Sequence, residues 1–192
     1  MTKHKCGWCI GDELYESYHD KEWGVPVYND HKFFECLVLE TFQAGLSWIT
    51  ILRKRENFKL ALDLFDYKKI ANYSKAKKAE LLNNKGIIRN KLKVNATVTN
   101  AQKFIKIQDE FGSFSHYIWS FVDGKPIINS VKNYKEAPAN TSLSDALSKD
   151  LKKRGFKFVG STVTYAFLQA TGVVNDHEVE CFRYDEVYNS TL

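Results

Sequence analysis

Apolar residues recur every three or four positions along most of the chain, which is the spacing of amphipathic helices. The clearest case follows Asp30, where Phe33, Phe34, Leu37 and Val38 share one face. No stretch alternates between strand and helix patterns in the way that a parallel sheet requires, and no internal repeat is present. The pattern therefore predicts an all-α fold.

Capping residues, glycines and prolines divide the chain into predicted helices. Asp12, Asp30, Ser47, Ser74 and Ser113 are the expected caps of five of them, and Ser142 to Asp145 resembles a capping box. The irregular stretch 124–141 is predicted to be a loop. The predicted helices cover residues 12–23, 30–41, 47–52 with a continuation to 65, 74–82, 89–110, 113–121, 142–154, 161–172 and 176–182.

The composition is that of a globular protein with one domain, or two small lobes that share a core. The chain has 192 residues, of which 44% are hydrophobic and 27% charged, and only four are cysteines. No apolar run approaches the ~20 residues of a membrane helix, and the polar N-terminus leads into no apolar signal core. We expect a cytoplasmic protein without a membrane partner. In a reducing compartment, clustered cysteine and histidine indicate metal binding more than disulfides.

The net charge of +5 is unevenly distributed. Residues 1–40 carry eight acids and four bases, whereas residues 68–106 carry eleven bases and one acid. Single lysines usually lie on a solvated helix face. A basic stretch of this length instead indicates binding to a polyanion, and nucleic acid is the most common one.

Cysteine and histidine occur in two groups at opposite ends of the chain. Cys6 and Cys9 have the spacing of half a zinc site, and His177 and Cys181 are four positions apart in a predicted helix. Spacing alone favours these four residues as ligands, with His19 competing with Cys9. The alternative is a set of unrelated buried cysteines and surface histidines.

A second group combines one acid with aromatic residues. Glu40 lies beside the apolar face of a predicted helix, where an unpaired carboxylate is costly. Three of the four tryptophans lie in the first 48 residues. Such a set suits a flat, cationic heterocycle, although a solvated acid among core aromatics is the simpler interpretation. The aromatic members are Trp8, Tyr15, Tyr18, Trp23 and Trp48.

The turn between two helices of the basic stretch is a candidate phosphate site. Gly86 permits a tight turn that exposes backbone N–H groups, and Lys85, Arg89 and Lys91 flank it, with Lys93 further along. A glycine between helices is often only a turn. The sequence contains no phosphate-binding P-loop, dinucleotide motif, nucleophile elbow or evident pair of catalytic carboxylates.

Several motifs together resemble the 3-methyladenine DNA glycosylase I family. The resemblance extends from about residue 6 to 182 and follows the family order. The motifs are Cys-Gly-Trp at 6–8, Tyr-His-Asp-x-Glu-Trp-Gly-Val-Pro at 18–26, Gln-Ala-Gly-Leu-Ser-Trp at 43–48, Gly-Ile-Ile-Arg at 86–89, Trp-Ser-Phe at 119–121, Asp-Ala-Leu-Ser-Lys at 145–149, Leu-Lys-Lys-Arg-Gly-Phe-Lys-Phe-Val-Gly at 151–160 and Val-Asn-Asp-His at 174–177.

The resemblance implies a fold of the helix-hairpin-helix glycosylase superfamily. Residues 1–192 would form one glycosylase unit, with a basic lobe at about 66–112 and the DNA-anchoring hairpin at 84–90. A structural Zn²⁺ would join the N- and C-terminal segments. Its family ligands correspond to Cys6, His19, His177 and Cys181, which selects His19 over Cys9.

The resemblance also implies an activity. Glu40, Tyr18 and Trp48 match residues that recognise the methylated base, and Tyr15, Trp8 and Trp23 fall around them. We expect a monomeric, monofunctional enzyme that flips 3-methyladenine out of double-stranded DNA, hydrolyses its N-glycosidic bond and binds the free base as product. Two alternatives remain: a zinc-containing DNA-binding protein without activity, and a glycosylase that also acts as a lyase through a lysine nucleophile.

Overall fold

The fold was analysed in a computed structural model that describes residues 3–189. The chain is mostly helical, as its pattern predicts, with one short pair of strands in addition. The helices are α1 (Glu13–Lys21), α2 (Asp30–Gln43), α3 (Trp48–Ala61), α4 (Tyr67–Ile70), α5 (Lys75–Asn83), α6 (Lys91–Phe111), α7 (Phe114–Trp119), α8 (Ser142–Lys153), α9 (Ser161–Ala170) and α10 (Phe182–Asn189). Short 3-10 turns are η1 (Asp63–Phe65), η2 (Ser120–Val122) and η3 (Tyr134–Glu136), and the strands are β1 (Ile127–Ile128) and β2 (Val174–Asn175).

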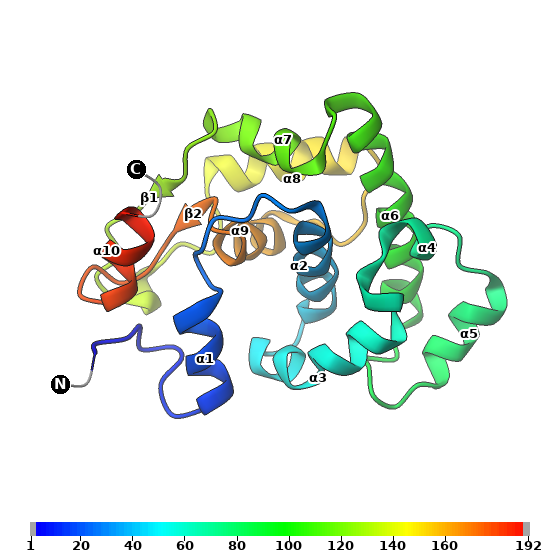
Figure 1. Cartoon of the computed structure of the whole chain (residues 1–192), viewed down its shortest axis with the longest axis horizontal. Coiled ribbons are helices and arrows are strands. Elements are labelled where there is room, and N and C mark those ends of the chain that lie inside the picture. Colours follow the sequence, from blue (N-terminus) through cyan, green and yellow to red (C-terminus); the bar gives the residue numbers. More distant parts are fainter. Residues whose placement is uncertain (1–2, 190–192) are drawn as a thin grey trace.

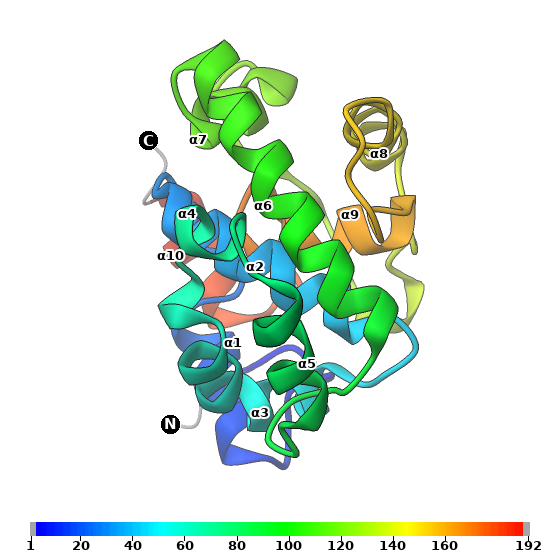
Figure 2. The same cartoon turned by 90° about the vertical axis from the view of Figure 1, so that its right-hand side faces the viewer.

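Helix α2 is the central element, and α3, α6, α7 and α9 pack against it (Figure 1). The long helix α6 crosses the side of the molecule that carries α4 and α5 (Figure 2). Aromatic rings fill the space between these helices. Phe104 and Phe114 stack with ring centroids 4.0 Å apart, and Phe33 contacts both Phe114 and Phe167. Because helices pack on several sides of α2, most of its circumference is buried and therefore apolar.

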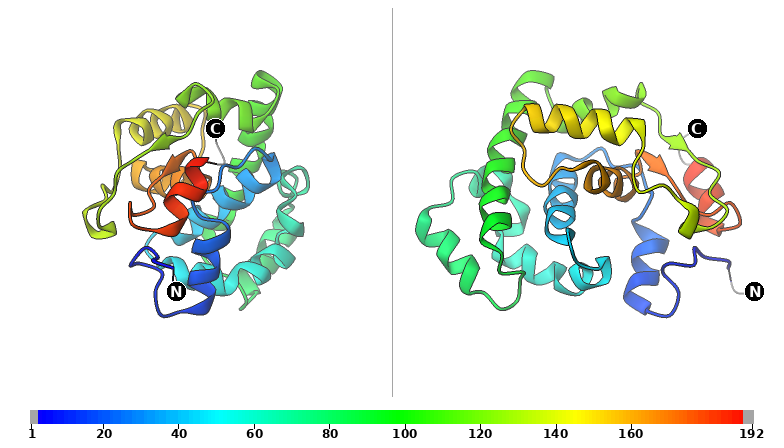
Figure 3. Two further views of the ribbon diagram at one scale, coloured as in Figure 1. Left: turned by 60° about the vertical axis from the view of Figure 1, so that its left-hand side comes forward. Right: turned by 180° about the vertical axis from the view of Figure 1, so that it is seen from behind.

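The first and last described segments lie side by side. Helices α1 and α10 occupy the same side of the molecule in every view (Figures 1 and 3). The backbone N–H of Phe182 donates to the carbonyl of His4 over 3.0 Å. The fold therefore brings the two cysteine- and histidine-bearing segments together. Among the described residues, none of the helices is both long and apolar enough to cross a bilayer.

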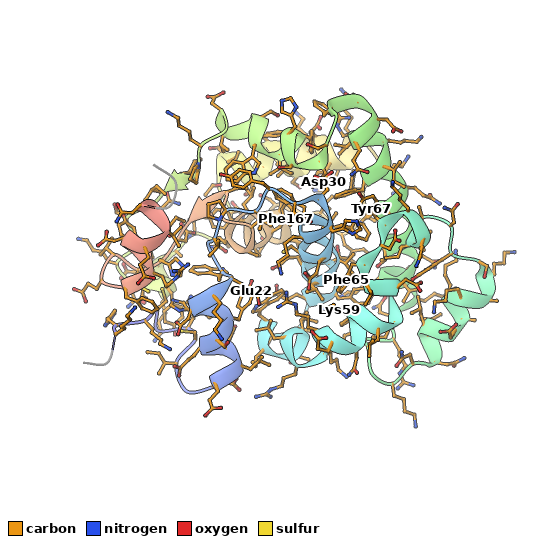
Figure 4. The ribbon with its side chains drawn as sticks, viewed as in Figure 1. Glu22, Asp30, Lys59, Phe65, Tyr67 and Phe167 are labelled. Atoms are coloured by element: carbon orange, nitrogen blue, oxygen red, sulfur yellow. The ribbon has the colours of Figure 1, made fainter. Side chains whose placement is uncertain are left out.

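The predicted caps are confirmed at α1, α5 and α7, where Ser113 accepts the N–H of His116, and wrong at α2. Asp12 accepts the backbone N–H of Tyr15 over 3.1 Å, and Ser74 caps α5 in the same manner. Asn29, not Asp30, caps α2. Asp30 instead accepts the first two backbone N–H groups of α7, which places it between two helix starts (Figure 4).

Two other helix starts differ by one or two positions from the prediction. Helix α8 is capped by Thr141, which forms the capping box with Ser144, so the box begins one residue before the predicted Ser142. Helix α6 begins at Lys91 because the side chain of Asn90 accepts the N–H groups of Leu92 and Lys93. The basic turn is therefore longer than the spacing of apolar residues suggests.

Two predictions near the C-terminus are wrong. The segment 124–141, predicted to be a loop, contains β1, which pairs in parallel with β2 through Ile127 opposite Val174. The segment 176–182 is not a helix, because the N–H of Val179 donates to the carbonyl of Val131 on the neighbouring segment rather than back along its own chain. Strands of two residues are too short to produce a recognisable alternation.

Candidate functional site

A cavity of about 200 Å³ opens between α1, α2, the start of α3 and α9. Residues from both ends of the chain and from the η3 turn contribute to its wall. The lining residues are Trp8, Tyr15, Tyr18, Trp23, Glu40, Gln43, Trp48, Tyr134, Ala137, Ala166, Gln169 and Asp176.

The acid and all five aromatic residues singled out in the sequence line this cavity. Tyr15 and Tyr18 are three positions apart on α1, so both side chains lie on one face. Glu40 is one turn before the end of α2, and Trp48 is the first residue of α3. The start of α3, the end of α2 and one face of α1 thus bring these side chains to the same cavity.

The rings are packed edge to face rather than in a single stack. Trp8 lies at centroid distances of 4.9 Å from Tyr15 and 5.0 Å from Trp23, both with steeply inclined planes. Tyr18 and Trp48 are 5.4 Å apart and tilted by 52°. The cavity is therefore bounded by ring faces and edges, which suits a planar aromatic guest.

Glu40 is the electrostatic anomaly of the cavity. Glu40 is 3% exposed, and within residues 3–189 its Oε2 has no hydrogen-bond partner. Burial raises the pKa of this carboxyl to about 8. Trp48 Nε1, a buried donor on the same cavity wall, also lacks a partner in the described part of the chain. A free acceptor and a free donor in one cavity can satisfy complementary polar atoms of a guest.

Asp176 is a second buried acid on the cavity wall, and its surroundings differ from those of Glu40. Its Oδ2 accepts from the hydroxyl of Tyr165 over 2.6 Å and from the amide of Gln169 over 2.7 Å. Its Oδ1 accepts from the amide of Asn129 over 2.7 Å. Three donors satisfy this carboxylate, so it is fixed in place, whereas Glu40 is left open to a guest.

Half of the lining residues were not predicted from the sequence. Gln43 and Asp176 lie within motifs that carry the family resemblance, so those motifs were a usable signal for both. Tyr134 and Ala137 come from the segment predicted to be a loop, and nothing in their spacing indicates a role. They reach the cavity because strand pairing brings residues 127–131 beside 174–178.

Four buried side chains form a compact cluster behind the aromatic wall. They are Cys6, His19, His177 and Cys181, and their ligand atoms all lie within 4.8 Å of one another. Each is at most 3% exposed. Hydrogen bonds from Cys6 and from the two imidazoles lower the pKa of the Cys181 thiol. Two imidazoles and two thiol groups of this kind can hold a metal ion.

Neighbouring groups orient the two histidines. His19 Nδ1 lies 2.8 Å from the Asp20 carboxylate, and His177 Nε2 lies 3.0 Å from the carbonyl of Trp23. The remaining ring nitrogens point into the cluster. Gly24 makes this approach possible, since a Cβ there would lie 2.9 Å from His177 Nε2.

Two expectations for this cluster need revision. Cys9 is buried but lies outside the group, and its thiol donates to the carbonyl of Cys6. His177 and Cys181 do approach each other, with His177 Nδ1 and Cys181 Sγ 3.7 Å apart. They do so across an irregular turn, not along the face of a helix as their four-residue spacing suggested.

The basic turn joins α5 to α6. Lys85, Arg89 and Lys91 are exposed, and within residues 3–189 none of the three forms an ion pair. The backbone N–H of Gly86 donates to Asn84 Oδ1 over 2.8 Å, so the expectation that the turn exposes this N–H group is wrong. Lys93 is only 5% exposed, so the expectation that it contacts phosphate is wrong.

The chain resembles known proteins of one family along nearly its whole length. The model of the methyladenine glycosylase family matches residues 8–184. The chain is 47% identical to DNA-3-methyladenine glycosylase 1 of Escherichia coli K12, covering 94% of this chain and 96% of that protein. It is 46% identical to DNA-3-methyladenine glycosylase of Haemophilus influenzae, covering 92% of this chain and 96% of that protein.

Solved structures lead to the same family. A crystal structure of 3-methyladenine DNA glycosylase I superposes with a TM-score of 0.90 at 47% identity, covering 93% of this chain and 98% of the other. A study of 3-methyladenine recognition by the Staphylococcus aureus enzyme supplies a second match, with a TM-score of 0.89 at 36% identity over 93% of this chain and 95% of the other.

Proposed function

The chain belongs to the methyladenine glycosylase family, and on this basis we propose that it hydrolyses the N-glycosidic bond of 3-methyladenine in alkylated DNA. The observation that carries the proposal is the cavity in which Glu40 Oε2 and Trp48 Nε1 are buried without partners. Such groups are costly unless a ligand satisfies them. A methylated purine offers both a planar ring and polar edge atoms.

In the proposed mechanism the enzyme flips the damaged nucleotide out of the duplex into this cavity. Trp48 stacks on the base, while Glu40 and Tyr18 hydrogen-bond its edge. Trp8, Tyr15 and Trp23 complete the wall around it. The cavity thereby distinguishes the cationic 3-methyladenine from neutral adenine, because only the cation gives Glu40 a counter-charge.

Cleavage of the glycosidic bond of 3-methyladenine does not require a strong acid catalyst. Methylation at N3 makes the base cationic in the nucleotide, so the C1′–N9 bond is already weakened. When the bond breaks, its electron pair leaves with the base, which departs neutral, and an oxocarbenium-like sugar remains. Water adds to C1′ and releases a proton. We assign Glu40 to substrate recognition and to stabilising this charge, and the free base remains as product in the cavity.

We infer a monofunctional enzyme, because a lyase needs an amine that can form a Schiff base with the sugar. Among the described residues, no lysine lines the cavity. Lys93 lies beside the end of α2, but its ammonium is engaged with the backbone carbonyls of Phe42 and Ala44. Borohydride should therefore trap no covalent complex with DNA that contains abasic sites.

We propose that the Cys6, His19, His177 and Cys181 cluster holds a structural zinc ion. With Zn–S near 2.3 Å and Zn–N near 2.05 Å, a tetrahedral site separates sulfur and nitrogen ligands by about 3.6 Å. Three such separations in the cluster are 3.4, 3.5 and 3.7 Å. The ion would fix the terminal segments and, through Trp23 against His177 at 4.7 Å, the cavity wall.

DNA anchoring is assigned to the turn between α5 and α6. We propose that Lys85, Arg89 and Lys91, around the turn at Gly86, form the phosphate-binding face of a helix-hairpin-helix motif within a basic lobe of about residues 66–112. The cations of this turn are exposed and form no ion pair among the described residues, which supports the assignment. In this proposal the protein is a cytoplasmic monomer that acts on double-stranded DNA. Light scattering of the complex with DNA measures how many protein chains bind one DNA molecule.

The test is an assay of bases released from methylated DNA, identified by chromatography. Release of free 3-methyladenine is the expected result. DNA binding without release of any base would instead support the alternative of a zinc-containing DNA-binding protein. A covalent complex after borohydride treatment would identify a lyase.

A further inference from the structure

A buried lysine connects the basic lobe to the cavity. Lys93 is the third residue of α6, directly after the basic turn, and its side chain is almost fully enclosed. Its ammonium donates to the carbonyl of Phe42 over 2.8 Å and to that of Ala44 over 2.6 Å. These carbonyls belong to the last turn and the cap of α2.

A cation at this position is expensive. Burial lowers the pKa of Lys93, which shows that the charged form is disfavoured there. The first turn of a helix also repels positive charge through the helix dipole. A leucine or methionine would fill the same space without either cost. The compensating interaction lies on α2, whose C-terminal carbonyls attract a cation.

Those carbonyls control a segment of the cavity wall. Gln43 and Trp48 both line the cavity, and the four residues between them form the connection from α2 to α3. Gly45 in this connection has a φ of 82°, and residues 45–47 are exposed. At the α3 end of the connection, the hydroxyl of Ser47 contacts Thr50 and forms no cap with the described α3 backbone. At the α2 end, Lys93 holds the connection through its hydrogen bonds to the carbonyls of Phe42 and Ala44.

Lys93 does not act on the cavity by its charge. Burial raises the pKa of Glu40, whereas the ammonium of Lys93 donates to the carbonyls of Phe42 and Ala44. The ammonium acts through the backbone that it holds. We propose that Lys93 is a positioning residue that fixes segment 43–48, so that Gln43 and Trp48 are in place for the flipped base and are tied to the helix that follows the DNA-binding turn. This inference rests on the proposed function.

The test compares Lys93→Met with Asn100→Ala. Lys93→Met keeps the length of the side chain and removes the ammonium. Asn100 provides the matched control, because it is also a buried polar residue of α6 whose side chain holds the backbone of a loop. Its side chain accepts from the backbone N–H of Lys157 over 2.8 Å and donates to the carbonyl of Lys157 over 3.0 Å. That loop does not line the cavity. Both variants are measured at a temperature at which both are folded.

We expect Lys93→Met to lower the single-turnover rate of 3-methyladenine excision and the affinity for free 3-methyladenine by about tenfold to a hundredfold, since displaced active-site groups have effects of this size. The salt dependence of binding to undamaged DNA should not change, because Lys93 contacts no phosphate. Asn100→Ala should lose stability but keep the excision rate and the base affinity. Should Lys93→Met not fold, Lys93→Gln, which keeps N–H donors, should show a smaller loss of the same two quantities.

Wild-type rate and base affinity in the folded Lys93 variant, as in Asn100→Ala, would overturn the inference and leave the lysine a purely stabilising role. A reduced salt slope would overturn it in favour of a phosphate contact. Failure of the wild-type protein to release 3-methyladenine would instead count against the proposed function, so the two failures are distinguishable.

Discussion

Replacing Glu40 with glutamine should stabilise the free protein while impairing its function. The folded state holds the Glu40 proton up to a pKa of about 8, whereas the unfolded chain releases it near 4.5. The folded state therefore binds more protons between these values, and its free energy of unfolding falls as the pH rises through that window. Glutamine has nearly the same shape and no charge, so the variant escapes this loss.

The size of the effect follows from the two pKa values. Each unit of difference corresponds to about 1.4 kcal/mol, so wild type loses about 3 kcal/mol by pH 7 and under about 1 kcal/mol by pH 5. The groups that face Glu40 do not obscure the effect, because burial raises the pKa of Tyr15, Tyr18 and Cys36 away from this window.

The assay is urea denaturation of wild type and Glu40→Gln at a series of pH values from 5 to 8. Glu56→Gln is the matched control, since Glu56 is exposed on α3 and should leave the stability unchanged. The variant should exceed wild type by under about 1 kcal/mol at pH 5 and by roughly 3 kcal/mol at pH 7. A difference that does not depend on pH, or a less stable variant at pH 7, would refute the reasoning.

Three further predictions concern the metal, the DNA and the pH dependence of catalysis. Cys181→Ser should lower the melting temperature and the zinc content together, whereas Cys9→Ser should retain the zinc; elemental analysis and calorimetry measure both. Lys85→Ala should weaken binding to all DNA sequences alike and reduce the salt slope by about one unit, as measured by titration at several salt concentrations. Excision under limiting enzyme should accelerate as Glu40 ionises toward pH 8, and Glu40→Gln should lack that acceleration; a parallel profile in the variant would assign it to another group.

The parts of the site that are predictable from sequence are those in which one residue stands out chemically from its neighbours. Glu40 is an acid beside the apolar face of a helix, and burial is exactly what gives it an unusual pKa. His19 could not be separated from Cys9 by spacing, because their distances from Cys181 depend on the path of α1. Only the family motif favoured His19, and the structure brings that imidazole to 3.4 Å from Cys181 Sγ.

The parts that escaped prediction depend on tertiary contacts. Asp30 has the chemistry of a cap and caps a helix, but the helix is α7, which is distant in sequence. In the sequence, Lys93 cannot be distinguished from the other bases of the basic stretch. It is buried only because α6 packs against the end of α2. Tyr134 reaches the cavity through a strand pair too short to detect. Local pattern therefore predicts helices well and long-range partners poorly.

The central claim is that the cavity containing Glu40 and Trp48 binds and excises 3-methyladenine. Single-turnover excision from 3-methyladenine DNA by Glu40→Gln and Trp48→Phe tests it, with Trp119→Phe as the control because Trp119 packs outside the cavity and donates to the carbonyl of Val27. Loss of a charge-assisted hydrogen bond should slow Glu40→Gln by about tenfold to 150-fold, and the smaller ring face available for stacking should slow Trp48→Phe by about twofold to tenfold. Trp119→Phe should retain the wild-type rate. Wild-type rates in both folded cavity variants would contradict the account and place the base-binding site elsewhere.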